Sequence, residues 1–374
     1  MTDMNSYPES PSISLRAYLL FFIITTAQVG VGGASFQRKI YKMAGQDSWV
    51  TVLIAGLICH LVVVAMFSFL KKYPGKDLYG IQKEAFGKWL GGVMSFIYAA
   101  YLILIALTII RNYAEIVQTW IFPDISPWFL ALMVLGLTLY GVLGGIRVIA
   151  GIGLVSVLII TLEMLLFYYP LQYANWGFLL PVMNHSPWEL LKGTEEISFS
   201  VVGFELLMFV FPFIRDTNKA PRYAHSAILF TTITYLIYML TALVYFSGGQ
   251  LIHTIWPTLT LLKIVEFPFI ERVEYITVSL YLIGILPNVM LYVWSASRGI
   301  PKMSPLKEKA ALYLVVVFLF VICTFFSSRL EIKRLNEISG QISIYMAFVY
   351  PLLLSVLLFF KKRVSQPRNG SDSR

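Results

Sequence analysis

The chain has 374 residues, of which 58% are hydrophobic and only 13% are charged, and its mean hydropathy is +0.74. A water-soluble protein of this length could not bury so much apolar surface, so the composition predicts an all-α polytopic membrane protein. Basic loops that orient membrane helices explain the net charge of +9, which therefore does not indicate a nucleic acid partner.

Apolar runs of about 20 residues, the length that crosses a bilayer, predict ten membrane-spanning helices. The expected spans are 15–41, 48–70, 92–119, 126–143, 147–171, 196–214, 222–246, 273–297, 309–327 and 339–360. With a cytoplasmic N-terminal tail at 1–14, most of the 29 Lys and Arg residues fall in cytoplasmic segments, including the basic tail 361–374. The positive-inside rule therefore predicts that both termini are cytoplasmic.

The first span contains the stretch QVGVGGASF (28–36), with three glycines in four positions. Glycine costs a helix about 1 kcal/mol relative to alanine. In hydrocarbon each unsatisfied backbone group costs several kcal/mol, so a broken helix persists only around a cavity or a ligand. We therefore expect a broken helix that lines a small-molecule site, and close helix packing is the alternative role of the glycines.

The segment 74–91 is expected to form an amphipathic helix on the inner surface. Its apolar face would consist of Leu78, Ile81, Ala85, Phe86, Trp89 and Leu90. In the third span, Tyr98 is a candidate ligand contact, and Arg111 and Glu115 have the i, i+4 spacing of a local ion pair.

The second half of the chain is expected to repeat the first with inverted topology. Spans 1–5 (15–171) and spans 6–10 (196–360) have similar lengths, and an outer loop at 172–195 separates them. Because each half has an odd number of spans, the second enters the membrane from the opposite side. The long amphipathic loop 247–272 would be the outer counterpart of 74–91.

Span 6 begins the second half and carries small and polar residues in the stretch SFSVVGFE (198–205). Interruptions at corresponding positions of two inverted halves point to a binding site near the middle of the membrane. Glu205 in this span and Glu163 in span 5 are candidates for proton or ion coupling, or for structural hydrogen-bonded acids. Tyr281 in span 8 is a further candidate ligand contact.

We expect neither an enzyme nor a metal or cofactor site. The two cysteines and four histidines have no metal-ligand spacing, and no catalytic constellation is present in the sequence.

The chain resembles the B-subunit, permease-like family of bacterial spore germinant receptors, within the amino acid–polyamine–organocation (APC) transporter superfamily. The resemblance spans nearly the whole chain. It is carried by the glycine break and by AGQDSWVTVLIAG (44–56), YPGKDLYGIQKEAFGKWLGG (73–92), RNYAEIVQTWIFPDISPW (111–128), NWGFLLPV (175–182) and FSVVGFELLMFVFPFI (199–214). It implies a LeuT-like fold with a 5+5 inverted repeat and broken helices 1 and 6.

The resemblance also implies ligand contacts at the two unwound segments. Carried over by position, these are Gly30, Val31, Gly32, Gly33 and Ala34 in span 1 and Phe199, Ser200, Val202, Gly203 and Phe204 in span 6. Many amino acid transporters have a small-aromatic-glycine run in helix 6, where this chain has FSVVGFE. This departure leaves the identity of the ligand open.

The expected function is therefore that of a germinant-sensing subunit. The resemblance implies that it binds a small molecule and assembles with an A-type membrane subunit and a C-type lipoprotein in the spore inner membrane. The alternatives are a proton- or sodium-coupled amino acid transporter and a structural or ion-conducting subunit without its own ligand.

Overall fold

A computed structural model describes residues 14–265, 273–326 and 328–361. Within these residues the regular structure is helical, with one isolated β-bridge between Leu15 and Ile214. The α-helices are α1 (Leu19–Gln28), α2 (Phe36–Ala44), α3 (Ser48–Leu70), α4 (Leu78–Trp120), α5 (Pro127–Leu143), α6 (Ile146–Leu166), α7 (Tyr168–Leu171), α8 (Pro187–Val201), α9 (Leu207–Val210), α10 (Ala220–Tyr245), α11 (Gly248–His253), α12 (Pro257–Leu262), α13 (Val273–Met303), α14 (Glu308–Phe325), α15 (Arg329–Ser343) and α16 (Tyr350–Phe360).

Short 3₁₀ and π segments join several of these helices. The 3₁₀ segments are η1 (Val31–Ala34), η2 (Gly45–Asp47), η3 (Trp176–Leu179), η4 (Phe204–Leu206) and η5 (Phe211–Phe213), and the π segment is η6 (Ile344–Val349). Most of the predicted tails 1–14 and 361–374, and part of the predicted loop 247–272, lie outside the described residues.

The described helices confirm a multi-pass membrane protein. Seven are long and apolar enough to cross a bilayer, or eight if the bent pair Pro187–Val201 and Phe204–Phe213 counts as one span. Two shorter apolar helices, α1 and α5, fall below that length. The count of ten spans therefore remains a prediction.

The last helix begins earlier than the expected start at 339. A capping box, in which Ser328 and Glu331 exchange hydrogen bonds, starts α15 at Arg329. Hydropathy did not include the residues before 339 because the segment RLEIKRLNE (329–337) is polar.

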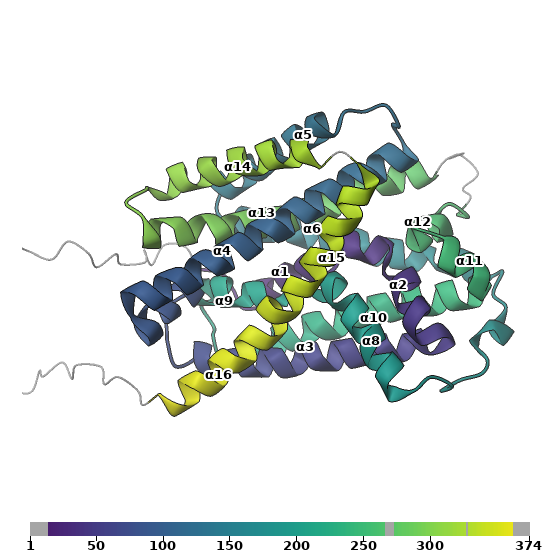
Figure 1. The fold of residues 1–374 in the computed structure, drawn as a ribbon, viewed down its shortest axis with the longest axis horizontal. Coiled ribbons are helices and arrows are strands. Elements are labelled where there is room, and N and C mark those ends of the chain that lie inside the picture. Colours follow the sequence, from purple (N-terminus) through teal and green to yellow (C-terminus); the bar gives the residue numbers. More distant parts are fainter. Residues whose placement is uncertain (1–13, 266–272, 327, 362–374) are drawn as a thin grey trace, which may run out of the picture.

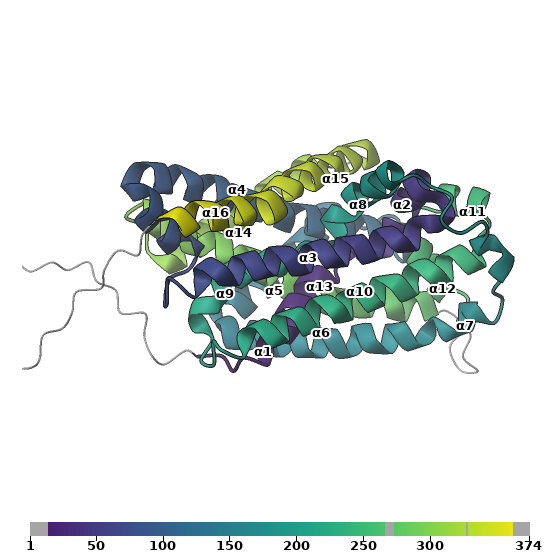
Figure 2. The same ribbon diagram turned by 90° about the horizontal axis from the view of Figure 1, so that it is seen from below.

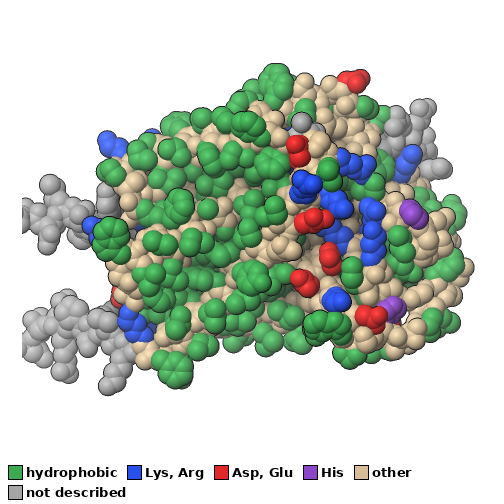
Figure 3. Space-filling model, in the orientation of Figure 1, with side chains coloured by type: hydrophobic (Ala, Val, Ile, Leu, Met, Phe, Trp, Pro, Cys, Tyr) green, Lys and Arg blue, Asp and Glu red, His purple; other side chains and the backbone are tan. Residues whose placement is uncertain are grey.

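The helices pack around α1, which contacts α6, α10 and α13 (Figures 1 and 2). The long helix α4 packs along α13, and α15 crosses α4 obliquely (Figure 1). The outer surface is strongly apolar: Trp89 and Phe96 on α4 are 89% and 66% exposed. Figure 3 shows hydrophobic side chains over most of one face, with charged side chains gathered in a band that crosses α8 and α15. Such a surface suits lipid contact.

The predicted amphipathic helix 74–91 is correct in its first half and wrong in its second. Leu78, Ile81 and Ala85 are buried, but Trp89 and Leu90 are exposed. Gly87 has φ +80°, which kinks α4 and turns the later residues onto a different face. A single helical period could not have shown this kink.

The predicted ion pair between Arg111 and Glu115 is not present. Glu115 pairs instead with Arg329, at 3.4 Å, because α15 packs against α4. Arg111 is fully buried, and its guanidinium nitrogens have no hydrogen-bond partner among the described residues.

Candidate functional site

The first helix is interrupted where the glycines occur. α1 ends at Gln28, Gly30 is extended (φ −128°, ψ −152°), and η1 leads into α2 at Phe36. Because of this interruption, several backbone carbonyls lack the hydrogen-bond donors that a continuous helix would supply.

A second interruption lies between α8 and α9. α8 ends at Val201, and Gly203 has φ +122°, a conformation that side chains rarely adopt. The two parts of this helix are bent by 54° at the break.

The two breaks contact each other through their glycines. A Cβ atom on Gly32 would lie 2.7 Å from the Cα of Ser200. A Cβ atom on Gly203 would lie 2.4 Å from the carbonyl carbon and oxygen of Ala27. Glycine at both positions therefore allows each break to approach the backbone of the other, a closer contact than any side chain permits.

Side chains from neighbouring helices satisfy most of the freed carbonyls. The Oη of Tyr235 lies 2.9 Å from the oxygen of Gln28 and 2.6 Å from that of Ser200. The other donors are Asn288 Nδ2 to Ala27 O (3.0 Å), Tyr281 Oη to Gly30 O (2.8 Å), Thr258 Oγ1 to Gly33 O (2.7 Å) and Gln28 Nε2 to Val201 O (2.7 Å). The breaks therefore persist in an apolar environment because the protein supplies the missing hydrogen bonds.

Glu205 stabilises the second break. Its Oε2 accepts a hydrogen bond from the backbone N–H of Gly203 at 2.6 Å. Its Oε1 accepts hydrogen bonds from the hydroxyls of Tyr101 and Tyr292, each at 2.9 Å. With three donors and no exposed surface, this carboxyl holds the backbone of the break in place.

The far ends of the interrupted helices are also tied together in pairs. After α2, the Asp47 carboxylate accepts hydrogen bonds from the backbone N–H groups of 183–185 and lies 3.0 Å from the His185 ring, just before α8. Before α1, Leu15 N donates to Phe213 O and Leu15 O accepts from Arg215 N, just after η5. α2 thus packs against α8, and α1 packs against η4, while Leu15 before α1 bonds to the end of η5. We call these the two half-helix pairs.

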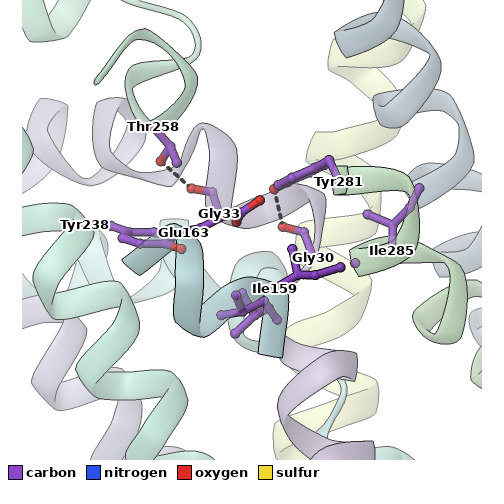
Figure 4. A pocket seen from close by; sticks show the side chains of 11 residues that line it. Gly30, Gly33, Ile159, Glu163, Tyr238, Thr258, Tyr281 and Ile285 are labelled. Carbon is purple, nitrogen blue, oxygen red and sulfur yellow. Dashed lines mark hydrogen bonds between the residues drawn. The ribbon is translucent and has the colours of Figure 1, made fainter. Parts of the chain in front are cut away.

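Two small cavities flank the breaks. The break cavity lies between them and has a volume of about 10 Å³; it is lined by Ala27, Gln28, Gly30, Val31, Gly32, Ile105, Ile109, Phe199, Ser200, Val202, Asn288 and Tyr292. The Glu163 cavity, of about 20 Å³, lies between the first break, α6, α10 and α13 (Figure 4). A single water molecule needs roughly 10–15 Å³ by this measure, so the site is closed around at most one or two waters.

Figure 4 shows the Glu163 cavity, with Glu163 between Tyr238 and Tyr281. Glu163 is 7% exposed, and its Oε1 has no hydrogen-bond partner among the described residues. The cavity therefore contains a buried carboxyl oxygen that is free to bind a proton or a donor.

The structure brings together nine of the fourteen predicted site residues around these cavities. The break cavity includes Gly30, Val31, Gly32, Phe199, Ser200 and Val202, and the Glu163 cavity includes Gly30, Gly33, Glu163 and Tyr281. The other predicted residues, Ala34, Tyr98, Gly203, Phe204 and Glu205, line neither cavity. Tyr98 packs against Tyr101, Phe209 and Tyr350 instead.

Several polar residues that complete the site were not predicted from the sequence, and Thr258, which donates to the oxygen of Gly33, is one of them. Gln28 and Asn288 line the break cavity, Tyr235 holds two of the freed carbonyls, and Tyr292 holds Glu205. An amide inside an apolar span is the signal that could have identified Gln28 and Asn288. The two tyrosines could not be distinguished among the 22 in the chain.

Comparison with known proteins identifies relatives over nearly the whole chain. Residues 14–334 match the spore permease family, described as "Spore germination protein". Spore germination protein GerQB of Bacillus cereus is 40% identical over 333 residues, which cover 89% of this chain and 92% of that protein. Spore germination protein A2 of Bacillus subtilis (strain 168) is 21% identical, with coverage of 94% and 98%.

A solved structure shares the fold. A Na⁺-coupled sialic acid symporter, in its substrate-bound outward-open state, superposes with a TM-score of 0.64 at 12% sequence identity. The alignment covers 92% of this chain and 78% of the symporter. At this identity the likeness shows the fold alone. Together with the family match, it establishes that the chain is a multi-pass membrane protein of the spore germination protein family.

Proposed function

We propose that this chain is the membrane subunit of a spore nutrient germinant receptor, which binds a small germinant between its two helix breaks and signals germination. The break cavity carries this proposal, because two interrupted helices face each other there beside unpaired amide oxygens. The spore germination proteins among its relatives support the biological setting.

Binding would be coupled to conformation because the break cavity is closed. At about 10 Å³ it is far smaller than any nutrient molecule. A germinant can enter only if the two half-helix pairs separate, so the ligand has a higher affinity for the open state. Such differential affinity is what shifts a conformational equilibrium, and partner subunits would respond to the shift.

The proposal includes the predicted topology. Ten spans would form a 5+5 inverted repeat of 15–171 and 196–360, with both termini in the cytoplasm and the protein in the spore inner membrane. The occurrence of a break in the first helix of each half supports this repeat. The A-type and C-type subunits would be its partners.

A larger side chain in the wall of the break cavity tests whether the germinant binds there. Ile109 is 3% exposed on α4 and lines the cavity. In spores that depend on this receptor, Ile109→Phe should raise the germinant concentration for half-maximal response at least tenfold. Ile116→Phe is the matched control, because Ile116 is equally buried on the same helix and lines neither cavity. Equal sensitivity of the two variants, at equal protein levels, would overturn the site assignment.

A second candidate function is ion-coupled transport, which the Glu163 cavity favours. Its unpaired Oε1 beside the first break could carry a proton or a cation through a transport cycle. Proteoliposomes that contain the purified chain distinguish the two functions. Accumulation of a solute that follows an imposed proton or sodium gradient, and that is lost in Glu163→Gln, would establish the transporter. Saturable binding without accumulation would establish the receptor.

A further inference from the structure

Two buried amide side chains that line the break cavity have oxygens without hydrogen-bond partners among the described residues. The side-chain nitrogens of Gln28 and Asn288 donate to the backbone oxygens of Val201 and Ala27. A carbonyl oxygen can only accept, so these bonds fix the orientation of both amides. Gln28 Oε1 and Asn288 Oδ1 then have no hydrogen-bond partner among the described residues, although each side chain is only 3% exposed.

Buried acceptors without partners are uncommon, and they indicate a ligand that donates. Both residues line the same cavity but come from different helices, α1 and α13. The site thus presents two fixed acceptors to whatever enters it.

The same cavity offers nothing to balance a charge. None of the described residues that line it is acidic, basic or histidine. Glu205 lies next to the second break but already accepts three hydrogen bonds and does not line the cavity.

Four backbone carbonyls at the two breaks are already engaged by side chains of the protein. The backbone oxygens of Ala27, Gln28, Ser200 and Val201 each accept a hydrogen bond from a side chain or lie within hydrogen-bond distance of the Tyr235 hydroxyl. A zwitterion would therefore lose its hydration without gaining an opposite charge in exchange.

We propose that the germinant is an uncharged molecule with at least two O–H or N–H donors on one edge and an apolar or ring face on the other, and that it is not a zwitterionic amino acid. The donors pair with Gln28 Oε1 and Asn288 Oδ1. The ring face packs against Ile105, Ile109 and Phe199, which are among the apolar residues that line the cavity. A nucleoside and a sugar both have this chemistry. The inference rests on the proposed function, because it concerns the ligand of the same site.

A binding panel on the full-length chain in lipid nanodiscs tests the inference. The labelled probes are inosine, glucose, L-alanine and L-valine, each titrated alone and in competition. We expect saturable binding of inosine or glucose that neither amino acid displaces. Binding of inosine alone assigns the nucleoside, and binding of glucose alone assigns the sugar.

Matched variants then locate the binding contacts. Gln28→Leu and Asn288→Leu should each weaken binding of the uncharged probe by about tenfold or more, since each removes an acceptor. Gln82→Leu is the control and should leave binding unchanged. Gln82 is fully buried on α4 and donates through Nε2 to Tyr350 Oη at 2.7 Å, but it lines neither cavity.

The outcomes separate the two proposals. Binding of an amino acid without either uncharged probe overturns this inference and leaves the germinant receptor intact. Unchanged binding of the uncharged probe in both cavity variants also overturns it. If no probe of any class binds, both the inference and the proposed function fail. Should the leucine variants not fold, the panel on the unaltered chain still decides between an uncharged and a zwitterionic ligand.

Discussion

Replacing Gly203 with alanine tests whether the second break depends on its glycine. The residue has φ +122°, and the added Cβ would lie 2.4 Å from the backbone carbonyl of Ala27. The strained dihedral angle costs about 1–3 kcal/mol, and relief of the overlap by backbone shifts costs about 1–3 kcal/mol more. We therefore expect Gly203→Ala to lower the free energy of unfolding by about 2–6 kcal/mol.

Thermal denaturation of the purified chain in detergent measures this loss. The folded fraction is read from the monodisperse peak in size-exclusion chromatography, at one fixed heating time because such unfolding is often irreversible. The apparent midpoint should fall by about 5 °C or more. Gly136→Ala on α5 is the control, because a Cβ there meets no atom within 4 Å, and alanine in a helix stabilises by about 1 kcal/mol. Equal midpoints for the two variants would refute the reasoning.

Three further substitutions probe acidic residues of the site region. Glu205→Gln should lose about 1–3 kcal/mol of stability, because its amide nitrogen would face either the N–H of Gly203 or the two tyrosine hydroxyls that now donate to the carboxyl. Glu163→Gln makes the same change at a carboxyl whose Oε1 has no partner among the described residues, so its melting midpoint should equal or exceed that of the unaltered chain. Asp47→Asn should accelerate limited proteolysis within 183–185 roughly tenfold, because it weakens the hydrogen bonds that hold this segment.

Each of these expectations can fail. A Glu163→Gln variant that melts as early as Glu205→Gln would show that the Glu163 carboxyl is a structural acid after all. Unchanged cleavage in Asp47→Asn would show that other contacts hold the segment before α8.

The interruption of the first helix could be predicted from the sequence, because three glycines within four residues strongly weaken a helix in an apolar run. The second break was also indicated, although the direct contact between Gly203 and Ala27 is a property of two segments far apart in the chain. Hydropathy identifies apolar runs well but does not detect helical segments that are polar. The start of α15, which is polar, was therefore missed.

The role of Glu205 could not be derived from its position alone. Mid-membrane depth made it a candidate for coupling or for a structural acid, and only the positions of Tyr101 and Tyr292 show three donors around it. Glu163, the other candidate, has an oxygen without a hydrogen-bond partner among the described residues. The two carboxyls differ because tertiary packing places three donors around Glu205 and none next to Glu163 Oε1 among the described residues.

The ties at Asp47 and Leu15 restrict how the chain can move. Each fastens two half-helices that are more than 130 residues apart in sequence, one tie at either end of the molecule. A half-helix can hardly tilt alone, since its tied companion must tilt with it. Any molecule bound between the breaks would therefore contact both half-helix pairs, and each pair extends to one end of the molecule. A subunit that binds a ligand without releasing it at the other end would need one of these contacts to break while the other stays intact.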